Sequence, residues 1–309
     1  MAVEISDGGG TPHATDYADL LSKLKTFATA NGWTSLEDTS DKLVLQGEGS
    51  GTEEIVVAFQ KYADVPGDAY GWHVNGYIGY VNGLTFFNQP GASNEYRSIP
   101  LWNSTIPYWF IVSGRRIIVI AKVSTTYQIC YAGFYLPYAS PGQYPYPMMI
   151  GGSYQGTAAP RYSGSSALAS AFWSGRAASG TKANYNLLTP NTEWKSEANN
   201  WLVASLAGTN YAGQQAQGLF PYMVTNPDLG TILRGTVDGD AVVVPIEIWL
   251  GGTSSATYKG IIGEMDGVFF VSGSGRGAED VVTIDGDDYV IVQDVFRTGV
   301  NNYAAVRLT

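Results

Sequence analysis

The sequence predicts a mainly β protein: an N-terminal helix plus an antiparallel β domain, a connector region, and a C-terminal β-barrel or sandwich domain. Helical spacing of nonpolar residues occurs clearly only near the start, and alternating spacing follows it. Tight-turn dipeptides separate the alternating segments. The composition, with 38 Gly, 21 Tyr, 8 Trp and only 14% charged residues, favours strands and turns over helical bundles.

The first predicted element is a helix within residues 15–32. Its nonpolar residues fall on one helical face: Tyr17, Leu20, Leu21, Leu24, Phe27 and Ala28. Thr15 or Asp16 can cap its start, and Asn31-Gly32 can supply the left-handed residue at its end. After it, residues 42–49, 53–62 and 70–81 alternate in period two and predict successive strands.

A hairpin is predicted over residues 107–123, where two nonpolar runs meet at Ser113-Gly114. Both arms are almost continuously nonpolar, which indicates strands buried on both faces or a surface that a partner covers. Residues 125–138 add another strand to this antiparallel meander.

A proline- and tyrosine-rich loop is predicted over residues 141–152, because Pro141, Pro145 and Pro147 disfavour regular structure. We expect this loop and the hairpin to supply a contact with a neighbouring subunit. Arg115 and Arg116 either make cation–π or interface contacts there or mark the solvent end of a strand. The candidate interface residues are Tyr108, Trp109, Arg115, Arg116, Tyr144, Tyr146, Met148 and Met149.

Three regions are predicted: residues 1–155, a connector or insertion over 156–215 that is rich in Ala, Ser and Gly, and a hairpin-built domain over 216–309. Short helices are possible at 166–179 and 193–206 of the connector. In the last region, Asp-Gly pairs at 238–239, 266–267 and 285–286 each separate two nonpolar runs and predict three hairpins.

The charge and cysteine content restrict the function. The formal net charge of −10 disfavours binding to nucleic acid phosphates and to anionic membranes. The single cysteine, Cys130, excludes an intrachain disulfide and is interpreted as a buried core thiol. We expect no signal peptide and no membrane span, because no basic-then-nonpolar leader and no sufficiently long nonpolar run occurs.

Catalytic constellations are scarce in the sequence. His13 and His73 are the only histidines, and no nucleophile-elbow motif or P-loop accompanies them. Acids at 264–266 and 285–288 could bind calcium or form a glycosidase pair, but Asp-Gly turns explain them better. Residues 273–278 match G-x-G-x-x-A, yet the following residues favour strand rather than the helix that a dinucleotide site needs.

The helix, the following NGW at 31–33, and residues 107–153 and 263–308 together resemble tail-associated virion structural proteins of bacteriophages, in particular baseplate components of contractile-tailed phages. The resemblance implies an assembly protein that works in several symmetric copies without a cofactor. It transfers no residue role.

We therefore expect a non-enzymatic structural component of a phage virion, in the tail baseplate. Its partners would be other tail or baseplate proteins and copies of itself, and it would be assembled in the host bacterial cytoplasm. The alternative is a carbohydrate- or receptor-binding tail protein, with a glycan-degrading enzyme a more distant third. Neither a cofactor nor a metal is expected.

Overall fold

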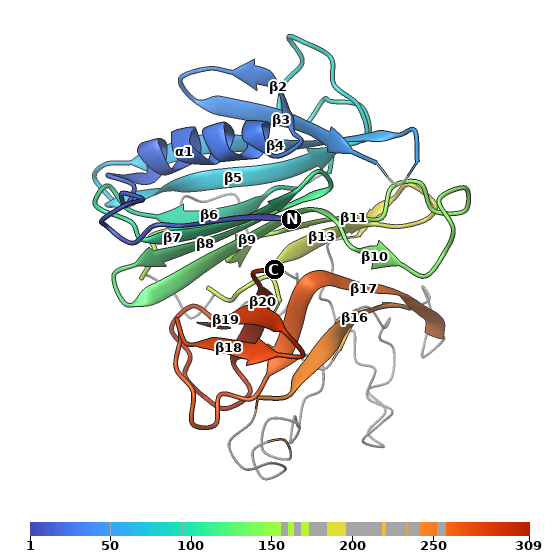
Figure 1. Ribbon diagram of the computed structural model, residues 1–309. Helices are drawn as coiled ribbons and strands as arrows, with labels where there is room; N and C mark the ends of the chain where they lie inside the picture. Colours follow the sequence, from blue (N-terminus) through green and yellow to red (C-terminus); the bar gives the residue numbers. More distant parts are fainter. Residues whose placement is uncertain are drawn as a thin grey trace.

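The computed structural model describes residues 1–49, 51–93, 95–155, 160–163, 168–172, 184–195, 218–220, 233, 241–251 and 258–309. Within these residues, three antiparallel sheets are stacked as layers and the helix α1 lies near the N-terminus, which confirms the mainly β fold with an N-terminal helix (Figure 1). The predicted split at 155 and 215 stays a prediction. Among the described residues, no helix has the length and nonpolar character that a membrane crossing requires.

The N-terminal sheet has the strand order β12-β6-β5-β4-β3-β2, and α1 packs beside it (Figure 1). Asp16 caps α1 through its carboxylate, and Asn31 and Gly32 (φ +96°) end the helix, as predicted. The alternating residues of the first three predicted strands lie in β3, β4 and β5. The bounds are α1 Tyr17–Ala30, β2 Thr34–Asp38, β3 Lys42–Glu48, β4 Glu54–Asp64, β5 Ala69–Tyr77, β6 Arg97–Leu101 and β12 Tyr154–Gln155.

The middle sheet has the order β1-β7-β8-β9-β11-β13-β14 and contains the predicted hairpin as β7 and β8. Ser113 pairs with Arg116, so the two-residue turn is Gly114-Arg115, one residue later than predicted. Met148 and Met149 lie in β11, a sheet strand, where a loop was expected. The bounds are β1 Ala2–Ile5, β7 Tyr108–Ser113, β8 Arg116–Val123, β9 Thr126–Phe134, β11 Met148–Gly151, β13 Tyr185–Leu188 and β14 Trp194–Lys195.

Both faces of the middle sheet are buried, which explains its continuous nonpolar strands. Alternate residues such as Phe110 and Val119 join the core that it shares with α1 and the N-terminal sheet. Their neighbours, such as Ile111 and Ile118, join a second core shared with the C-terminal sheet. Of the two interpretations that the sequence left open, the structure supports burial within the chain.

The C-terminal sheet has the order β15-β16-β17-β20-β19-β18, with β10 also paired to β17. Asp285-Gly286 forms the predicted turn between β18 and β19, and both residues have positive φ (+53° and +89°). The bounds are β10 Leu136–Pro137, β15 Gly218–Phe220, β16 Val243–Gly251, β17 Tyr258–Val271, β18 Val281–Ile284, β19 Asp287–Gln293 and β20 Tyr303–Arg307.

The hairpin predicted at Asp266-Gly267 is wrong, because both residues lie inside the single strand β17. Between the Pro245–Phe269 and Glu247–Glu264 pairs, β17 advances five residues while β16 advances two. The left-handed Gly267 (φ +71°) lies in this irregularity. The Asp-Gly pair at 238–239 lies outside the described residues.

The described part of residues 156–215 contributes to the core and to the middle sheet. Leu168 is buried, and Ala171 and Phe172 belong to the second core together with Tyr185 and Leu187 of β13. Residues 168–172 and 193–195 are not helical. The rest of the two possible helices lies outside the described residues.

Candidate contact site

The eight candidate interface residues do not form one surface. Six of them are at most 8% exposed and pack inside the chain: Tyr108, Trp109, Arg116, Tyr144, Met148 and Met149. Arg115 is exposed at the hairpin turn, and Tyr146 is half-buried against the first core. The interpretation of the six buried residues as surface anchors is therefore corrected: they are core residues between the stacked sheets.

Arg116 links the middle sheet to the C-terminal sheet. Its side chain is 2% exposed, and its Nε lies 3.1 Å from Asp266 Oδ2 without hydrogen-bond geometry. The guanidinium occupies the space that a side chain at position 267 would need, since an added Cβ would lie 2.3 Å from Arg116 Nη1. Asp266 is thus an internal ion-pair partner, and a calcium-binding role for it has no support in this geometry.

The proline–tyrosine loop over residues 141–152 is anchored to the rest of the chain by Tyr144. Tyr144 accepts a hydrogen bond from the Tyr135 hydroxyl (2.5 Å) and donates its own to the Leu188 carbonyl oxygen. Burial is the main cause that raises the pKa of both hydroxyls. The loop is therefore held down onto the middle sheet rather than projecting as a contact arm.

The loop over residues 78–93 presents nonpolar side chains to solvent. Val81, Leu84 and Phe87 are 47%, 38% and 45% exposed. The buried Gln89 fixes the loop: its amide oxygen accepts from the Val81 N–H (2.8 Å), and its amide nitrogen donates to two loop carbonyls. Phe87 also lies against Tyr96, with ring centroids 5.5 Å apart. The strand predicted over residues 70–81 ends at Tyr77 in the structure, so residues 78–81 belong to this loop. No element was predicted from the sequence over residues 82–93, and the exposed aromatic residue was missed.

The edge strand β18 is a second accessible feature. It hydrogen bonds to β19 on one side, and Val281 is 57% exposed (Figure 1). All four of its residues, VVTI, are uncharged and β-branched. Acids stand on both sides of it in the chain, at Glu279, Asp280, Asp285, Asp287 and Asp288.

The two histidines make structural contacts. His73 lies between the rings of Tyr62 and Tyr96, and its Nδ1 is 2.8 Å from Ser98 Oγ. Burial lowers the pKa of His73 to about 4, so its neutral form predominates at neutral pH. His13 Nδ1 is 3.0 Å from Ser6 Oγ. Cys130 is fully buried, which raises the pKa of its thiol.

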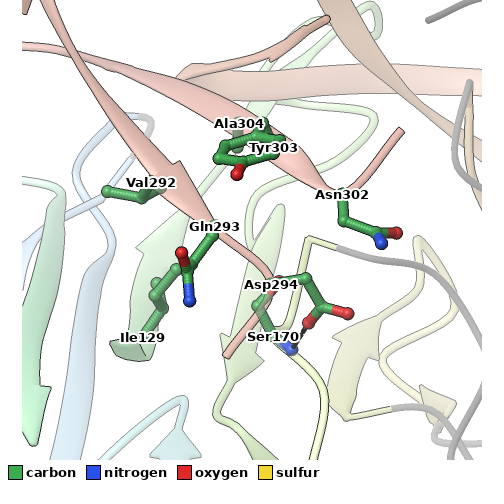
Figure 2. A pocket seen from close by; sticks show the side chains of 8 residues that line it. All are labelled: Ile129, Ser170, Val292, Gln293, Asp294, Asn302, Tyr303 and Ala304. Atoms are coloured by element: carbon green, nitrogen blue, oxygen red, sulfur yellow. Dashed lines mark hydrogen bonds between the residues drawn. The ribbon is translucent and has the colours of Figure 1, made fainter. Parts of the chain in front are cut away.

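A small cavity adjoins Asp294 where β19 ends and β20 begins, beside Ile129 of the middle sheet (Figure 2). Its volume of about 10 Å³ suits a single water molecule and is too small for a substrate. The Asp294 carboxylate accepts from the Ser170 N–H (2.6 Å) and from Arg297 Nη1 (2.9 Å), and Arg297 also donates to the Leu168 carbonyl oxygen (2.7 Å). Burial raises the pKa of Asp294 to about 6 despite these partners. The cluster fastens residues 168–172 to the C-terminal sheet.

An open, acidic groove of about 310 Å³ lies where β3 ends and β4 begins. Its charged lining residues are Glu48, Glu53 and Glu54, and the rest of its wall is mostly glycine. Within the described ranges, no group of three or more His, Cys, Asp or Glu side chains is arranged to hold a metal ion. The groove therefore supplies negative potential without a ligand cage.

The G-x-G-x-x-A match at residues 273–278 follows β17 and leads into the strand β18. No helix begins there, so the geometry of a dinucleotide site is missing from this segment. Comparison of the chain with protein-family models and with curated proteins gave no match, so no family assignment or residue role is transferred to it.

Proposed function

We propose that this chain is a structural component of a bacteriophage virion, in the tail baseplate, and acts through protein–protein contacts in a symmetric assembly. The observation that carries the proposal is the three-sheet stack, in which most large nonpolar and aromatic side chains are buried in two internal cores. Such a body holds its surface loops and sheet edges in fixed positions, as an assembly subunit requires. The phage setting is part of the proposal and rests on the resemblance of the hairpin and C-terminal segments to phage tail proteins.

The accessible features also favour contact over catalysis. The described surface offers a fixed nonpolar loop at residues 78–93 and an open sheet edge at β18. Exposed nonpolar groups on a fixed loop and an unpaired edge are common elements of protein interfaces.

Particle composition tests the proposal. Antibodies raised against the purified chain would be applied to phage lysates, and labelled particles would be imaged by electron microscopy. We expect labelling at one symmetric position near the tail end, and the chain in purified particles by mass spectrometry. Absence of the chain from purified particles, with abundant free chain in the lysate, would contradict the proposal.

A second function, recognition of a host carbohydrate, is favoured by one observation. Phe87 is 45% exposed, stands beside Tyr96, and is held by a hydrogen-bonded loop, which is how an aromatic platform for a sugar ring is built. A glycan array with the wild-type chain and Phe87→Ala would test it. Val81→Ala, on the same loop without an aromatic ring, is the matched control.

A further inference from the structure

We infer that the outer edge of β18 takes an extended, basic segment of a partner protein as an added antiparallel or parallel strand. The inference rests on the proposed function, because it names the chemistry of one partner in that assembly. It concerns the edge of the C-terminal sheet at Val281–Ile284 (Figure 1).

The register of the β18–β19 hairpin decides which backbone groups face outward. Ile284 and Asp287 flank the two-residue turn, so they form a hydrogen-bonded pair. Hydrogen-bonded pairs alternate in an antiparallel ladder, so Val282 also points its backbone groups toward β19. The Asp280 carbonyl oxygen also points toward β19, since it accepts from the Ile291 N–H (2.8 Å). The Ile291 carbonyl oxygen accepts from the Glu279 N–H (2.8 Å), so the ladder ends in a bulge at residues 279–280.

The N–H and C=O groups of Val281 and Thr283 therefore point away from β19. Within the described part of the chain, these four groups have no hydrogen-bond partner. The strand itself carries no lysine, proline or inward-pointing charge, the usual means by which natural edges avoid pairing. The edge is thus a short template for strand addition.

The negative charge around β18 favours a partner strand that carries basic residues. No Lys or Arg occurs between residues 277 and 296, whereas five acids occur there before Tyr289. Lys122 pairs with Glu279 and Arg307 pairs with Asp287, whereas Asp280, Asp285 and Asp288 form no ion pair with any residue that the structure describes. These carboxylates lie near both ends of the strand. A partner strand with basic residues at its ends matches this pattern.

The same charges disfavour a second copy of this chain. In a two-fold antiparallel pairing in which Val281 faces Thr283 of the other copy, Asp280 at one end of the strand would lie close to Asp285 at the opposite end of the other copy's strand. Like charges directly opposite each other oppose pairing, and both copies carry a net charge of −10. Self-pairing is therefore treated as an outcome of the test rather than as the proposal.

Peptide binding to the full chain tests the inference. The probe is a fluorescent peptide of alternating Val and Thr with two Lys residues at each end. Three comparison peptides have Glu in place of Lys, N-methyl groups on the backbone amides that would hydrogen bond to β18, or both changes. We expect saturable binding of the Lys peptide, followed by fluorescence anisotropy, with at least about tenfold weaker binding of the Glu and N-methylated peptides. No binding of the Lys peptide at millimolar concentration, or equal binding of the four peptides, would overturn the inference.

Two variants locate the site on the chain. Thr283→Pro removes an outward N–H at an edge position that tolerates proline, and we expect it to weaken binding about tenfold or more. Thr283→Val is the matched control, since it also loses the 2.6 Å bond to Asp288 but keeps the N–H, and it should bind like wild type. Equal binding by Thr283→Pro with an unchanged circular dichroism spectrum would overturn the inference. If Thr283→Pro does not fold, the comparison of the Lys peptide with its N-methylated form on the wild-type chain tests whether binding needs the backbone hydrogen bonds.

The charge contribution has its own test. The double variant Asp280→Asn/Asp285→Asn keeps the turn, since Asn also adopts positive φ, and we expect about three- to tenfold weaker binding of the Lys peptide. Unchanged affinity would overturn the basic character of the partner. A dimer of the chain alone in sedimentation velocity that Thr283→Pro abolishes would replace the proposed partner with a second copy. Presence of the wild-type chain in particles without peptide binding would reject this inference and leave the proposed function standing.

Discussion

The two interfaces of the middle sheet are built differently. Between the N-terminal and middle sheets, the buried charge is Arg97, which donates mainly to backbone carbonyls, including that of Tyr185 in the middle sheet (3.2 Å). Between the middle and C-terminal sheets, side-chain ion pairs cross the layers: Arg116 with Asp266, and Lys122 with Glu279. Among the described residues, no ion pair joins the first two layers.

The first interface mainly stabilises the fold, and the second also specifies how its two sheets align. The first interface holds α1 and large nonpolar residues from both sheets, so burial of nonpolar area holds it together. The second also buries nonpolar residues, but its buried Arg116 needs the Asp266 carboxylate across the layers as its partner. Nonpolar contacts tolerate small shifts between layers, whereas ion pairs fix one alignment. The following variants test this comparison.

The largest effect is expected from Phe110→Ala in the first interface. Phe110 is fully buried and stands beside Tyr108 and Phe27, with ring centroids 4.2 and 6.1 Å away. Its truncation should lower the free energy of unfolding by about 3–5 kcal/mol. Urea unfolding followed by tryptophan fluorescence measures it. Phe87→Ala, at an exposed ring, is the control and should change stability little, so equal effects of the two would contradict the assignment of the core.

A smaller loss is expected from Asp266→Ala in the second interface. It leaves the buried Arg116 guanidinium without a carboxylate, and we expect a loss of about 2–3 kcal/mol, below the usual value because Asp266 is 26% exposed. Adding Arg116→Met should recover part of the loss, because no unpaired charge then remains. A double-mutant cycle from urea unfolding measures the coupling. Strictly additive effects would show that the pair does not couple the layers.

The pH dependence of Asp294→Asn probes the second interface further. The pKa of Asp294 is raised from 3.8 to about 6, so the folded state binds this proton more tightly than the unfolded state. Its stabilising contribution is present below about pH 4 and is lost as the pH rises through 6. Relative to the Asn variant, the wild type should lose on the order of 1–3 kcal/mol between pH 4 and 7. A pH-independent difference between the two would contradict it.

His73→Phe should show the opposite slope in the N-terminal sheet. The pKa of His73 is lowered from 6.5 to about 4 by burial, so the unfolded state binds this proton more tightly. Its contribution is present above about pH 6.5 and is lost as the pH falls toward 4. Relative to the Phe variant, the wild type should become less stable on acidification, by on the order of 1–2 kcal/mol. Thermal unfolding of both proteins at several pH values checks the sign.

The sequence predicted what local chemistry determines. Asp16, Asn31 and Gly32 bound the helix where capping rules place them, and Asp285-Gly286 forms a turn because both residues adopt positive φ readily. The same dipeptide at 266–267 does not turn, because Gly267 instead accommodates the guanidinium of Arg116 from another sheet. That contact joins residues about 150 positions apart, and local turn preference carries no information about it.

The candidate contact residues were misplaced for a related reason. Tyr, Trp, Met and Arg are enriched in interfaces, but they fill cores equally well. Trp109 and Met149 face the C-terminal sheet, and Tyr108 and Met148 face the N-terminal sheet. An outer sheet therefore buries each face of the middle sheet, and composition alone does not predict that. The β18 edge was predicted only as a strand. Its position at the end of the sheet depends on the pairing of β17, β20 and β19, which the chain order does not give.

The double burial of the middle sheet has a consequence for how the chain folds. β1 joins this sheet by pairing Ala2 with Val112, and β10 reaches β17 by pairing Leu136 with Glu264. Such distant pairings form slowly, because the entropy of closing a long loop is lost before any stabilising contact forms. Until both outer sheets dock, the hairpin of β7 and β8 exposes nonpolar side chains on two faces. Newly made chains are thus most prone to aggregate in this interval, and a chaperone that shields residues 108–123 would raise the yield of folded protein.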